Sequence, residues 1–364
     1  MNISQTSGVT MADLSPPDLT KIKRVLIVKL SAMGDILHAL PVASALKASF
    51  PHLEIGWAVQ TNFALLLEGN PSLTRIHEVP PLRVNHLNRR DYRRDYPASL
   101  REIRQCRYDL VLDLQGLTKS ALVAVWSGAS LRYGYHWLRE LARIVEKPIP
   151  KRSQSVHVVD QYLDTAHFFG AAVRPVTFPF LISDTDSAHV KSLLREGGIR
   201  EGDRFLSVNP ASAQPLKQWG ESHFAGIMDR IYEKTGTPCV LLTSDKAVAG
   251  KVAAAAQHPF VDLSGKTTLK QLGGVIAESR VHLCGDTGSA HLAAALGVST
   301  ITLVGPTAPD RICPYGQRAN VFSHKEVCDP ACNWHHCAFP HAKCLAAITE
   351  GEVVERILGL MPPD

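Results

Sequence analysis

Three short segments of the chain carry residue types that could perform group transfer, and each follows an apolar run of strand length. The first segment is residues 31–38 (SAMGDILH), after the run at 24–30. The Asp35 carboxylate, at the start of an expected helix, could accept a proton from an incoming hydroxyl. Gly34 permits a tight turn, and the helix N-terminus offers N–H groups to an oxygen-rich ligand. An acid here also complements the helix dipole, which is the alternative explanation for its presence.

The second segment is residues 284–295 (CGDTGSAHLAAA), which follows a strand expected at 281–283. An acid or threonine can cap the helix that begins there, while a glycine and a serine leave its first turn open to a phosphate. An ordinary capped helix with a buried histidine explains the same spacing. Asp286 or Thr287 is the candidate cap, and Gly288 and Ser289 are the residues whose backbone amides a diphosphate could reach.

The third segment is the polar loop at residues 209–219 (NPASAQPLKQW). Lys217 could bring one cation to a leaving diphosphate, although a solvated surface lysine is the simpler alternative. Two other phosphate motifs are excluded. The chain has no G-x-G-x-x-G at these loops, and residues 264–267 (SGKT) resemble the end of a P-loop but have Phe260 where its first glycine belongs.

The elements that must position these loops alternate between strands and helices in both halves of the chain. Short apolar runs separated by helical patterns predict an α/β fold, with two Rossmann-like, doubly wound domains in tandem facing a central cleft. A proline-rich extended stretch at 170–183 marks the linker. The expected divisions are a disordered tail over 1–20, a first domain over 21–175, a second domain over 176–345 and a final helix within 346–364.

Length and composition fit this organisation. The chain has 364 residues, 45% of them hydrophobic and 20% charged, which is the composition of a globular protein rather than a fibrous or disordered one. The first 20 residues lack the pattern of a secretory signal. No run approaches the roughly 18 apolar residues that a bilayer span needs, so we expect a cytoplasmic protein whose contact with membranes is peripheral.

Four separated motifs resemble the bacterial heptosyltransferases of glycosyltransferase family 9. They are VLIVKLSAMGDILHALP from residue 25, LDLQGLTKSALVA at 112–124, the loop around 217–219, and GDTGSAHLAAALGVSTITLVGPTAP at 285–309. The resemblance runs in order from about residue 23 to residue 358. Within the family, the strings at 29–38 and 115–121 are most similar to the heptosyltransferase I subgroup, which adds the first heptose to Kdo on lipid A.

The resemblance implies a GT-B fold, an ADP-heptose donor, inversion at the anomeric centre, and a last helix that returns to the first domain. It assigns Asp35 as general base and Lys217 as a contact to donor phosphate. The chain departs from the family at 243–246 (TSDK), where Asp245 stands in for the usual acidic nucleoside contact. The donor-binding residues are then Ser212, Asp245, Asp286, Thr287, Gly288, Ser289 and His291, and the acceptor-binding residues Ser31, Met33, Gly34, His38 and Lys119.

Residues 83–107 hold eight arginines and three acidic residues, a surplus that equals the net charge of +5 of the whole chain. Nucleic-acid binding and a merely solvated helix are two interpretations, but no nucleic-acid motif accompanies the stretch. In an acceptor domain, arginines suit the carboxylates of Kdo, the phosphates of lipid A and an anionic inner-membrane surface. We therefore add Arg83, Arg89 and Arg90 to the acceptor-binding set.

Four cysteines cluster near the end of the chain, at Cys328, Cys332, Cys337 and Cys344, with three histidines between them. Their spacing matches no common zinc finger or ribbon. A structural zinc or iron, a labile disulfide and free thiols all stay open, and the transfer chemistry requires no metal or other cofactor.

The sequence thus favours an inverting glycosyltransferase with an ADP-heptose-like donor and a Kdo-lipid A acceptor. Another family 9 transferase with a different donor or acceptor sugar is the nearest rival. A non-catalytic nucleotide-sugar-binding protein is a second, disfavoured because Asp35 is intact. A dinucleotide-dependent enzyme would need the missing glycine motif.

Overall fold

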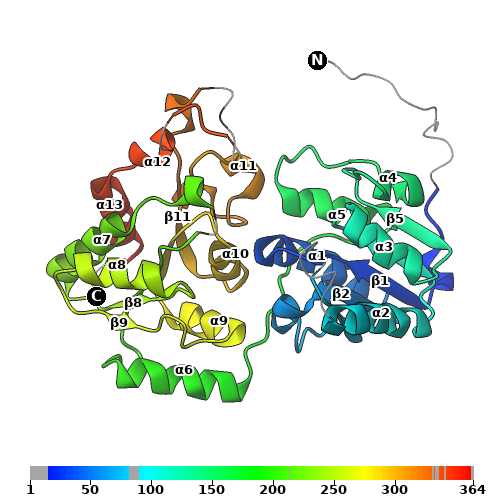
Figure 1. Cartoon of the computed structure of the whole chain (residues 1–364), viewed down its shortest axis with the longest axis horizontal. Helices are drawn as coiled ribbons and strands as arrows, with labels where there is room; N and C mark the ends of the chain where they lie inside the picture. Colours follow the sequence, from blue (N-terminus) through cyan, green and yellow to red (C-terminus); the bar gives the residue numbers. More distant parts are fainter. Residues whose placement is uncertain are drawn as a thin grey trace.

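Two parallel sheets, each of six strands, form the framework of the protein (Figure 1). The computed structural model describes residues 15–81, 90–212, 214–329, 332, 336–339 and 342–361, with side chains from residue 93 onward in the second range. The first sheet has the order β3-β2-β1-β4-β5-β6 and the second β12-β11-β10-β7-β8-β9. Both sheets therefore have the same doubly wound topology, and the order of connection reverses between β1 and β4 and between β7 and β10.

The strands of the first sheet are β1 (Arg24–Val28), β2 (Glu54–Gln60), β3 (Arg75–Val79), β4 (Leu110–Asp113), β5 (Leu131–Gly134) and β6 (Lys147–Pro148). Those of the second are β7 (Leu206–Asn209), β8 (Cys239–Leu241), β9 (Val261–Asp262), β10 (Val281–Gly285), β11 (Ser299–Leu303) and β12 (Val321–Phe322). The central strands are mainly apolar, because helices cover both faces of a parallel sheet, and the few polar side chains in them, such as Ser207 and His282, are buried.

The helices of the first half are α1 (Met33–Ser49), α2 (Arg90–Gln105), α3 (Thr118–Trp126), α4 (Ala142–Val145) and α5 (Val158–Phe168). Those of the second half are α6 (Asp184–Glu196), α7 (Glu221–Thr235), α8 (Lys246–Ala255), α9 (Leu269–Glu278), α10 (Gly288–Ala295), α11 (Pro309–Ile312), α12 (Lys343–Ala346) and α13 (Glu350–Leu360). Short 3-10 helices lie at Leu19–Lys21, Thr61–Leu66, Pro215–Lys217, Arg318–Asn320 and Lys325–Val327. None of the described helices combines the length and apolar character needed to cross a bilayer.

The two halves meet directly through helices. No helix or strand forms from residue 169 to residue 183, where the chain passes from α5 to α6. Helix α1 of the first half lies against α10 of the second (Figure 1), and buried apolar side chains of both helices belong to one continuous core. The N-termini of these two helices, which carry the candidate residues, are therefore brought together.

The last helix corrects one expectation. We expected it to return to the first domain, but α13 packs on α7 and β11 of the second sheet (Figure 1). Its buried residues, Val353, Val354 and Ile357, join the core of that half. The polar side of α13 also contacts the second half, because Glu350 forms ion pairs with His223 and Arg230 of α7. An amphipathic helix buries its stripe on whichever apolar surface is adjacent, and the sequence pattern does not name that surface.

The expected disordered tail, residues 1–20, also extends too far along the chain. Residues 1–14 lie outside the described part of the chain. Asp18, however, caps the 3-10 helix Leu19–Lys21 through the Thr20 N–H, and Leu19 is buried in the first core. A single apolar residue with a neighbouring cap is enough to attach this end to the fold.

Candidate active site

The candidate residues lie at the switch point of each sheet. In the first sheet, β1 leads into Asp35 at the start of α1, and its neighbour β4 leads into Lys119 at the start of α3. In the second sheet, β7 leads into the loop of Lys217, and its neighbour β10 leads into Asp286 before α10. The carboxyl edge of a doubly wound sheet at this point is where such folds bind ligands.

Asp35 is half-buried in the first turn of α1. Its Oδ2 accepts the Ala32 N–H over 3.3 Å, so the carboxylate also caps the helix. The loop before it is held by the Gln115 side chain, whose Oε1 accepts the backbone N–H groups of Leu30 and Ser31 at 3.2 and 3.1 Å. Lys119 completes this cluster by donating from Nζ to Ser31 Oγ over 2.7 Å. Burial lowers the pKa of Lys119, and the Asp35 carboxylate opposes that shift.

Lys217 and Asp286 form an ion pair in the second half. Lys217 Nζ lies 2.7 Å from Asp286 Oδ2, and both side chains are largely buried. Thr307 Oγ1 donates to the same carboxylate oxygen over 2.8 Å. The 3-10 helix Pro215–Lys217 brings the lysine to this position from its loop. The pair thus places one partly desolvated cation beside the N-terminus of α10.

The N-termini of α1 and α10 touch at two glycines. A methyl group built on Gly34 would lie 2.6 Å from His291 Cδ2, and one built on Gly288 would lie 2.7 Å from Met33 Cγ. Each glycine therefore allows a side chain of the opposite helix to approach closely. At Gly288, in the first turn of α10 where we expect a phosphate, the neighbouring side chain is that of Met33.

His291 lies where the charges of the two halves meet. Its Nδ1 is 3.0 Å from His38 Nε2, and both rings are buried. Burial lowers the pKa of His291 to about 4, with Asp286 and Asp35 raising it and Lys217 lowering it. Burial likewise lowers the pKa of His38 well below its ordinary value. The neutral histidine pair thus connects α1, which begins with the candidate base Asp35, to α10, which begins beside the candidate cation Lys217.

We expect this pair to make the protein less stable in mild acid. Because the folded state holds both rings neutral while the unfolded chain protonates them near pH 6.5, stability should be present above that pH and be lost as the pH falls toward about 4. Melting temperatures of the parent protein and of His38→Gln, measured across this range, test it. The variant should show a shallower decline, and equal slopes would contradict the assignment.

Ser289 belongs to a buried hydrogen-bond chain that the sequence did not reveal. Ser279 donates to Ile276 O and accepts from Ser207, whose Oγ lies 2.9 Å from His282 Nδ1. His282 Nε2 in turn lies 3.0 Å from Ser289 Oγ. Burial lowers the pKa of His282 to about 3, so the ring is neutral.

These contacts determine which atom donates and which accepts in each hydrogen bond of the chain. His282 must donate from Nδ1 to Ser207 and accept the Ser289 hydroxyl at Nε2. Ser289 Oγ then accepts from Asn209 Nδ2 over 3.1 Å and from Thr287 Oγ1 over 2.9 Å. Asn209 and His282 are the residues that sequence reasoning missed. The only sequence feature that could have indicated Asn209 and His282 is their position in strands that lead to the site. Many residues with a purely structural role share that position.

Replacing His282 with leucine should loosen the first turn of α10 without touching the reacting groups. The Ser289 hydroxyl would lose its acceptor in a buried place, which costs about 1–3 kcal/mol. We expect a lower melting temperature and weaker ADP binding in calorimetry, and His282→Gln, which keeps an acceptor near the Nε2 position, should recover part of both. Unchanged ADP affinity in the leucine variant would show that the chain serves stability alone.

The other predicted residues have varied surroundings. Ser212 is half-buried in the Lys217 loop, where its carbonyl accepts from Gln218 Nε2. Asp245 caps α8 through the N–H groups of Ala247 and Val248. Arg83 and Arg89 lie outside the described residues, as does the side chain of Arg90.

The clustered cysteines show no bond between sulfurs. All eight cysteines of the chain are described, and none forms a disulfide. Cys344 is buried next to Cys328, and its burial raises its pKa to about 12. In the described ranges, no three histidine, cysteine or acidic side chains are grouped as a metal site. His335 and His341 fall outside those ranges, and a structural zinc or iron stays one of the alternatives that the sequence left open.

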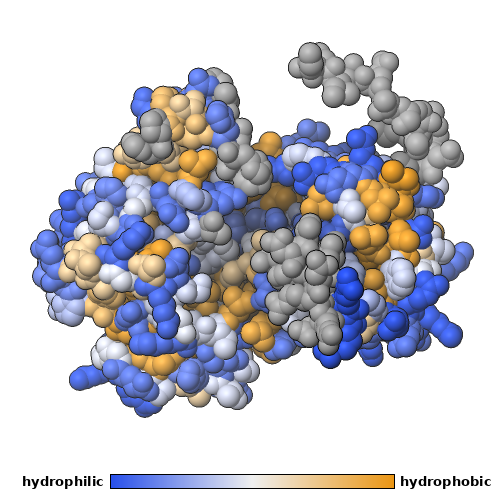
Figure 2. All heavy atoms as spheres, viewed as in Figure 1, coloured by the Kyte–Doolittle hydropathy of each residue, from blue (hydrophilic) through white to orange (hydrophobic). Residues whose placement is uncertain are grey.

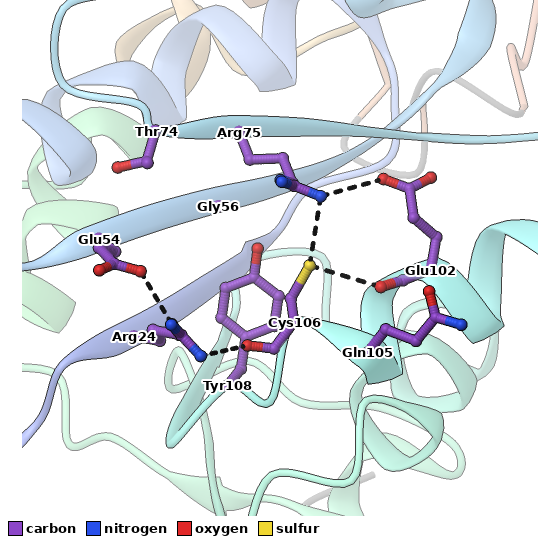
Figure 3. Close-up of a pocket in the computed structure, with 9 residues that line it drawn as sticks. All are labelled: Arg24, Glu54, Gly56, Thr74, Arg75, Glu102, Gln105, Cys106 and Tyr108. Carbon is purple, nitrogen blue, oxygen red and sulfur yellow. Dashed lines mark hydrogen bonds and ion pairs between the residues drawn. The ribbon is translucent and has the colours of Figure 1, made fainter.

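A cavity elsewhere in the first half does not belong to this site (Figure 3). It measures about 340 Å³ and lies at the amino ends of β1, β2 and β3, the opposite edge from Asp35. Its arginines are engaged, since Arg24 Nε bonds Glu54 at 2.8 Å and Arg75 lies 3.9 Å from Glu102 (Figure 3). The paired charges leave no net attraction for an anion.

Comparison with known proteins agrees with this arrangement. The family model described as glycosyltransferase family 9 (heptosyltransferase) matches residues 98–342. Lipopolysaccharide heptosyltransferase 1 of Pseudomonas aeruginosa is 28% identical over 309 residues, covering 81% of this chain and 82% of the relative. That of Escherichia coli K12 is 26% identical over 320 residues, covering 82% and 92%.

Two solved structures share the fold. A family 9 glycosyl transferase of Veillonella parvula has a TM-score of 0.79 at 19% identity, covering 93% of this chain and 97% of the other. Heptosyltransferase WaaC of E. coli with ADP has a TM-score of 0.66 at 24% identity, covering 93% and 99%. The expected α/β architecture of the GT-B type is confirmed.

Proposed function

The chain belongs to glycosyltransferase family 9, and from this premise we propose that it transfers a heptose from an ADP-heptose-like donor to Kdo of lipid A in lipopolysaccharide inner-core biosynthesis. The names of its relatives support the substrate class. One observation carries the proposal. The start of α1, which carries Asp35, lies against α10 at Gly34 and His291, and Lys217 pairs with Asp286 at 2.7 Å just before α10 begins.

Asp35 is the general base in this proposal. A hydroxyl of the acceptor sugar attacks the anomeric carbon of the donor and passes its proton to the Asp35 carboxylate, while the bond from that carbon to the diphosphate oxygen breaks. Attack from the face opposite the leaving group inverts the anomeric centre. The carboxylate lies half-buried in the first turn of α1, the helix that packs against α10 of the other half.

Lys217 and the first turn of α10 neutralise the leaving ADP. Its diphosphate gains charge as the bond breaks, and a nearby cation with oriented N–H groups stabilises that charge. The Thr287 hydroxyl proton is already used by Ser289, so the backbone N–H groups of Gly288 and Ser289 do this together with Lys217.

The remaining residues of the site divide between the two substrates. Ser212 and Asp245 contact the nucleotide side of the donor, and Asp286 and His291 line the sugar side. Ser31, Gly34, His38 and Lys119 face the acceptor, with Arg83, Arg89 and Arg90 binding its anionic groups. Lys119 suits the Kdo carboxylate, because it is half-buried and already donates into this loop. Proton transfer and charge neutralisation need no resident cofactor.

Product analysis tests the function. The full-length protein is incubated with ADP-heptose, other ADP-sugars or UDP-sugars, and with Kdo-lipid A or a heptosylated lipid A as acceptor, and products are identified by mass spectrometry. Heptose added only to Kdo-lipid A is the expected result. Transfer from another donor, or only to the heptosylated acceptor, would instead assign a different family 9 reaction, and ADP binding without any product would assign a binding protein.

A further inference from the structure

The outer side of α3 and α4 exposes large apolar side chains that no part of the described chain covers. The two helices lie side by side in the first half of the molecule (Figure 1), and they pack on each other through Ala121, Leu138 and Ala142. Facing outward are Leu122, Val125 and Trp126 of α3 and Ile144 of α4, which are 39%, 41%, 50% and 81% exposed. Figure 2 shows the resulting apolar area on this half of the molecule.

Three of these side chains share one side of α3, and Ile144 is exposed on α4, the helix packed against α3. Leu122, Val125 and Trp126 are three and four residues apart, so they share one side of α3. The side of α3 that faces the sheet, with Val123 and Ala124, is buried in the core instead. The chain thus places its large apolar residues on both sides of one short helix, and an exposed group of this kind marks a contact surface.

Basic side chains surround this face. Residues 118–152 hold seven basic and two acidic residues. One of the acids, Glu146, is buried beside Asp113, and burial raises its pKa to about 10, so it adds no negative charge at neutral pH. Arg139, just before α4, and Arg143, within α4, are exposed, and Arg104 of α2 donates to the Trp126 carbonyl at the end of α3.

The face is directly connected to the candidate active site. Lys119, in the first turn of α3, donates to Ser31 beside Asp35. Trp126 ends the same helix seven residues later, about 10 Å along its axis at 1.5 Å per residue. A sugar anchored by acyl chains in a bilayer under Trp126 could therefore reach the Asp35 loop without leaving the membrane.

We propose that the face formed by Leu122, Val125, Trp126 and Ile144, with Arg104, Arg139 and Arg143 around it, docks on an anionic lipid bilayer. Apolar side chains within a basic surround match a membrane with acidic headgroups, because the arginines attract the headgroups while the apolar groups enter the interface. This inference rests on the proposed function, which requires a lipid-linked acceptor. It adds the surface that delivers that acceptor and the orientation of the cleft at the membrane.

Vesicle binding tests the surface without any sugar substrate. The full-length protein is sedimented with vesicles of phosphatidylglycerol and phosphatidylcholine, and with vesicles of phosphatidylcholine alone. We expect binding to the anionic vesicles that weakens with salt, and a loss of about tenfold or more in Leu122→Gln/Trp126→Gln/Ile144→Gln and in Arg139→Glu/Arg143→Glu. All five positions are exposed, and equal melting temperatures will confirm that the variants are folded.

Matched controls come from the second half of the molecule. Val327→Gln removes an exposed apolar side chain there, and Arg195→Glu/Lys234→Glu reverses two exposed charges. Both should bind vesicles like the parent protein. Equal loss in control and test variants, or vesicle binding that no variant changes, would overturn the proposal. So would a dimer in light scattering that the triple glutamine variant dissociates, because the face would then bind a second copy.

Activity separates this proposal from the proposed function. With Kdo-lipid A in anionic vesicles, the triple glutamine variant should lose about tenfold or more in turnover at low enzyme concentration. With a deacylated, water-soluble acceptor it should match the parent. If neither protein transfers heptose but vesicle binding still depends on the face, the proposed function fails and the docking surface stands.

Discussion

Asp35→Asn is expected to lower turnover by about 10²- to 10⁴-fold while ADP binding stays close to that of the parent protein. Asparagine has no carboxylate to accept the acceptor proton, but it keeps an oxygen for the Ala32 N–H that Asp35 now accepts. The helix cap is therefore preserved, and the loss should be in kcat rather than in folding. Steady-state rates with a saturating donor, together with ADP calorimetry, measure both.

Asp18→Asn is the matched control for this variant. Asp18 also caps a helix through its carboxylate, but that helix leads into the amino end of β1, whereas Asp35 follows the carboxyl end of the same strand. It should leave turnover unchanged. If Asp35→Asn retained turnover within a few-fold of the parent, Asp35 would have no part in proton transfer, and another base would have to be found.

Lys217→Met is the second change with a large expected effect. Removing the cation takes away the charge that stabilises leaving ADP, a loss of about 10²- to 10³-fold in kcat/KM. It also leaves Asp286 without its ion-pair partner in a largely buried place, where breaking such a pair costs about 3–5 kcal/mol. The remaining Thr307 donor will offset part of that cost. Thermal unfolding measures the loss of stability, and steady-state kinetics with varied donor measure the loss in kcat/KM.

A double variant distinguishes catalysis from stability at this pair. Lys217→Met/Asp286→Asn removes both charges, so it should recover much of the lost stability, since no buried charge is left unpaired. Its activity should stay low, because the cation is still absent. Recovery of activity along with stability would mean that Lys217 acts only by holding Asp286, and that leaving-group stabilisation comes from α10 alone.

Much of the fold was predictable from local pattern. The apolar runs at 24–30 and 281–283 became strands β1 and β10 within a few residues of the expected bounds. Buried parallel strands need continuous apolar residues, and that requirement is visible in any single sequence. The two-residue strands β6 and β12 lie at sheet edges and are too short to show a period in the sequence.

The site was predictable in its residue types and in the sheet edge that holds them. The rule that ligands bind at the carboxyl ends of parallel strands follows from topology, which the alternation of elements predicts. Partners across the sheet were not predictable. Asn209 and His282 hold Ser289 in place, but polar residues within strands carry no sequence signal that separates a hydrogen-bonded role from any other.

The sequence by itself determined which loops carry an acid, a lysine and a glycine-opened helix start, because these depend on the residues next to each other along the chain. Only the tertiary structure decided that His291 meets His38, that Lys217 pairs with Asp286, and that α13 packs on its own half. These contacts join residues far apart in the chain. Their geometry depends on how two complete helix-covered sheets pack together, and that packing is a property of surfaces rather than of local spacing.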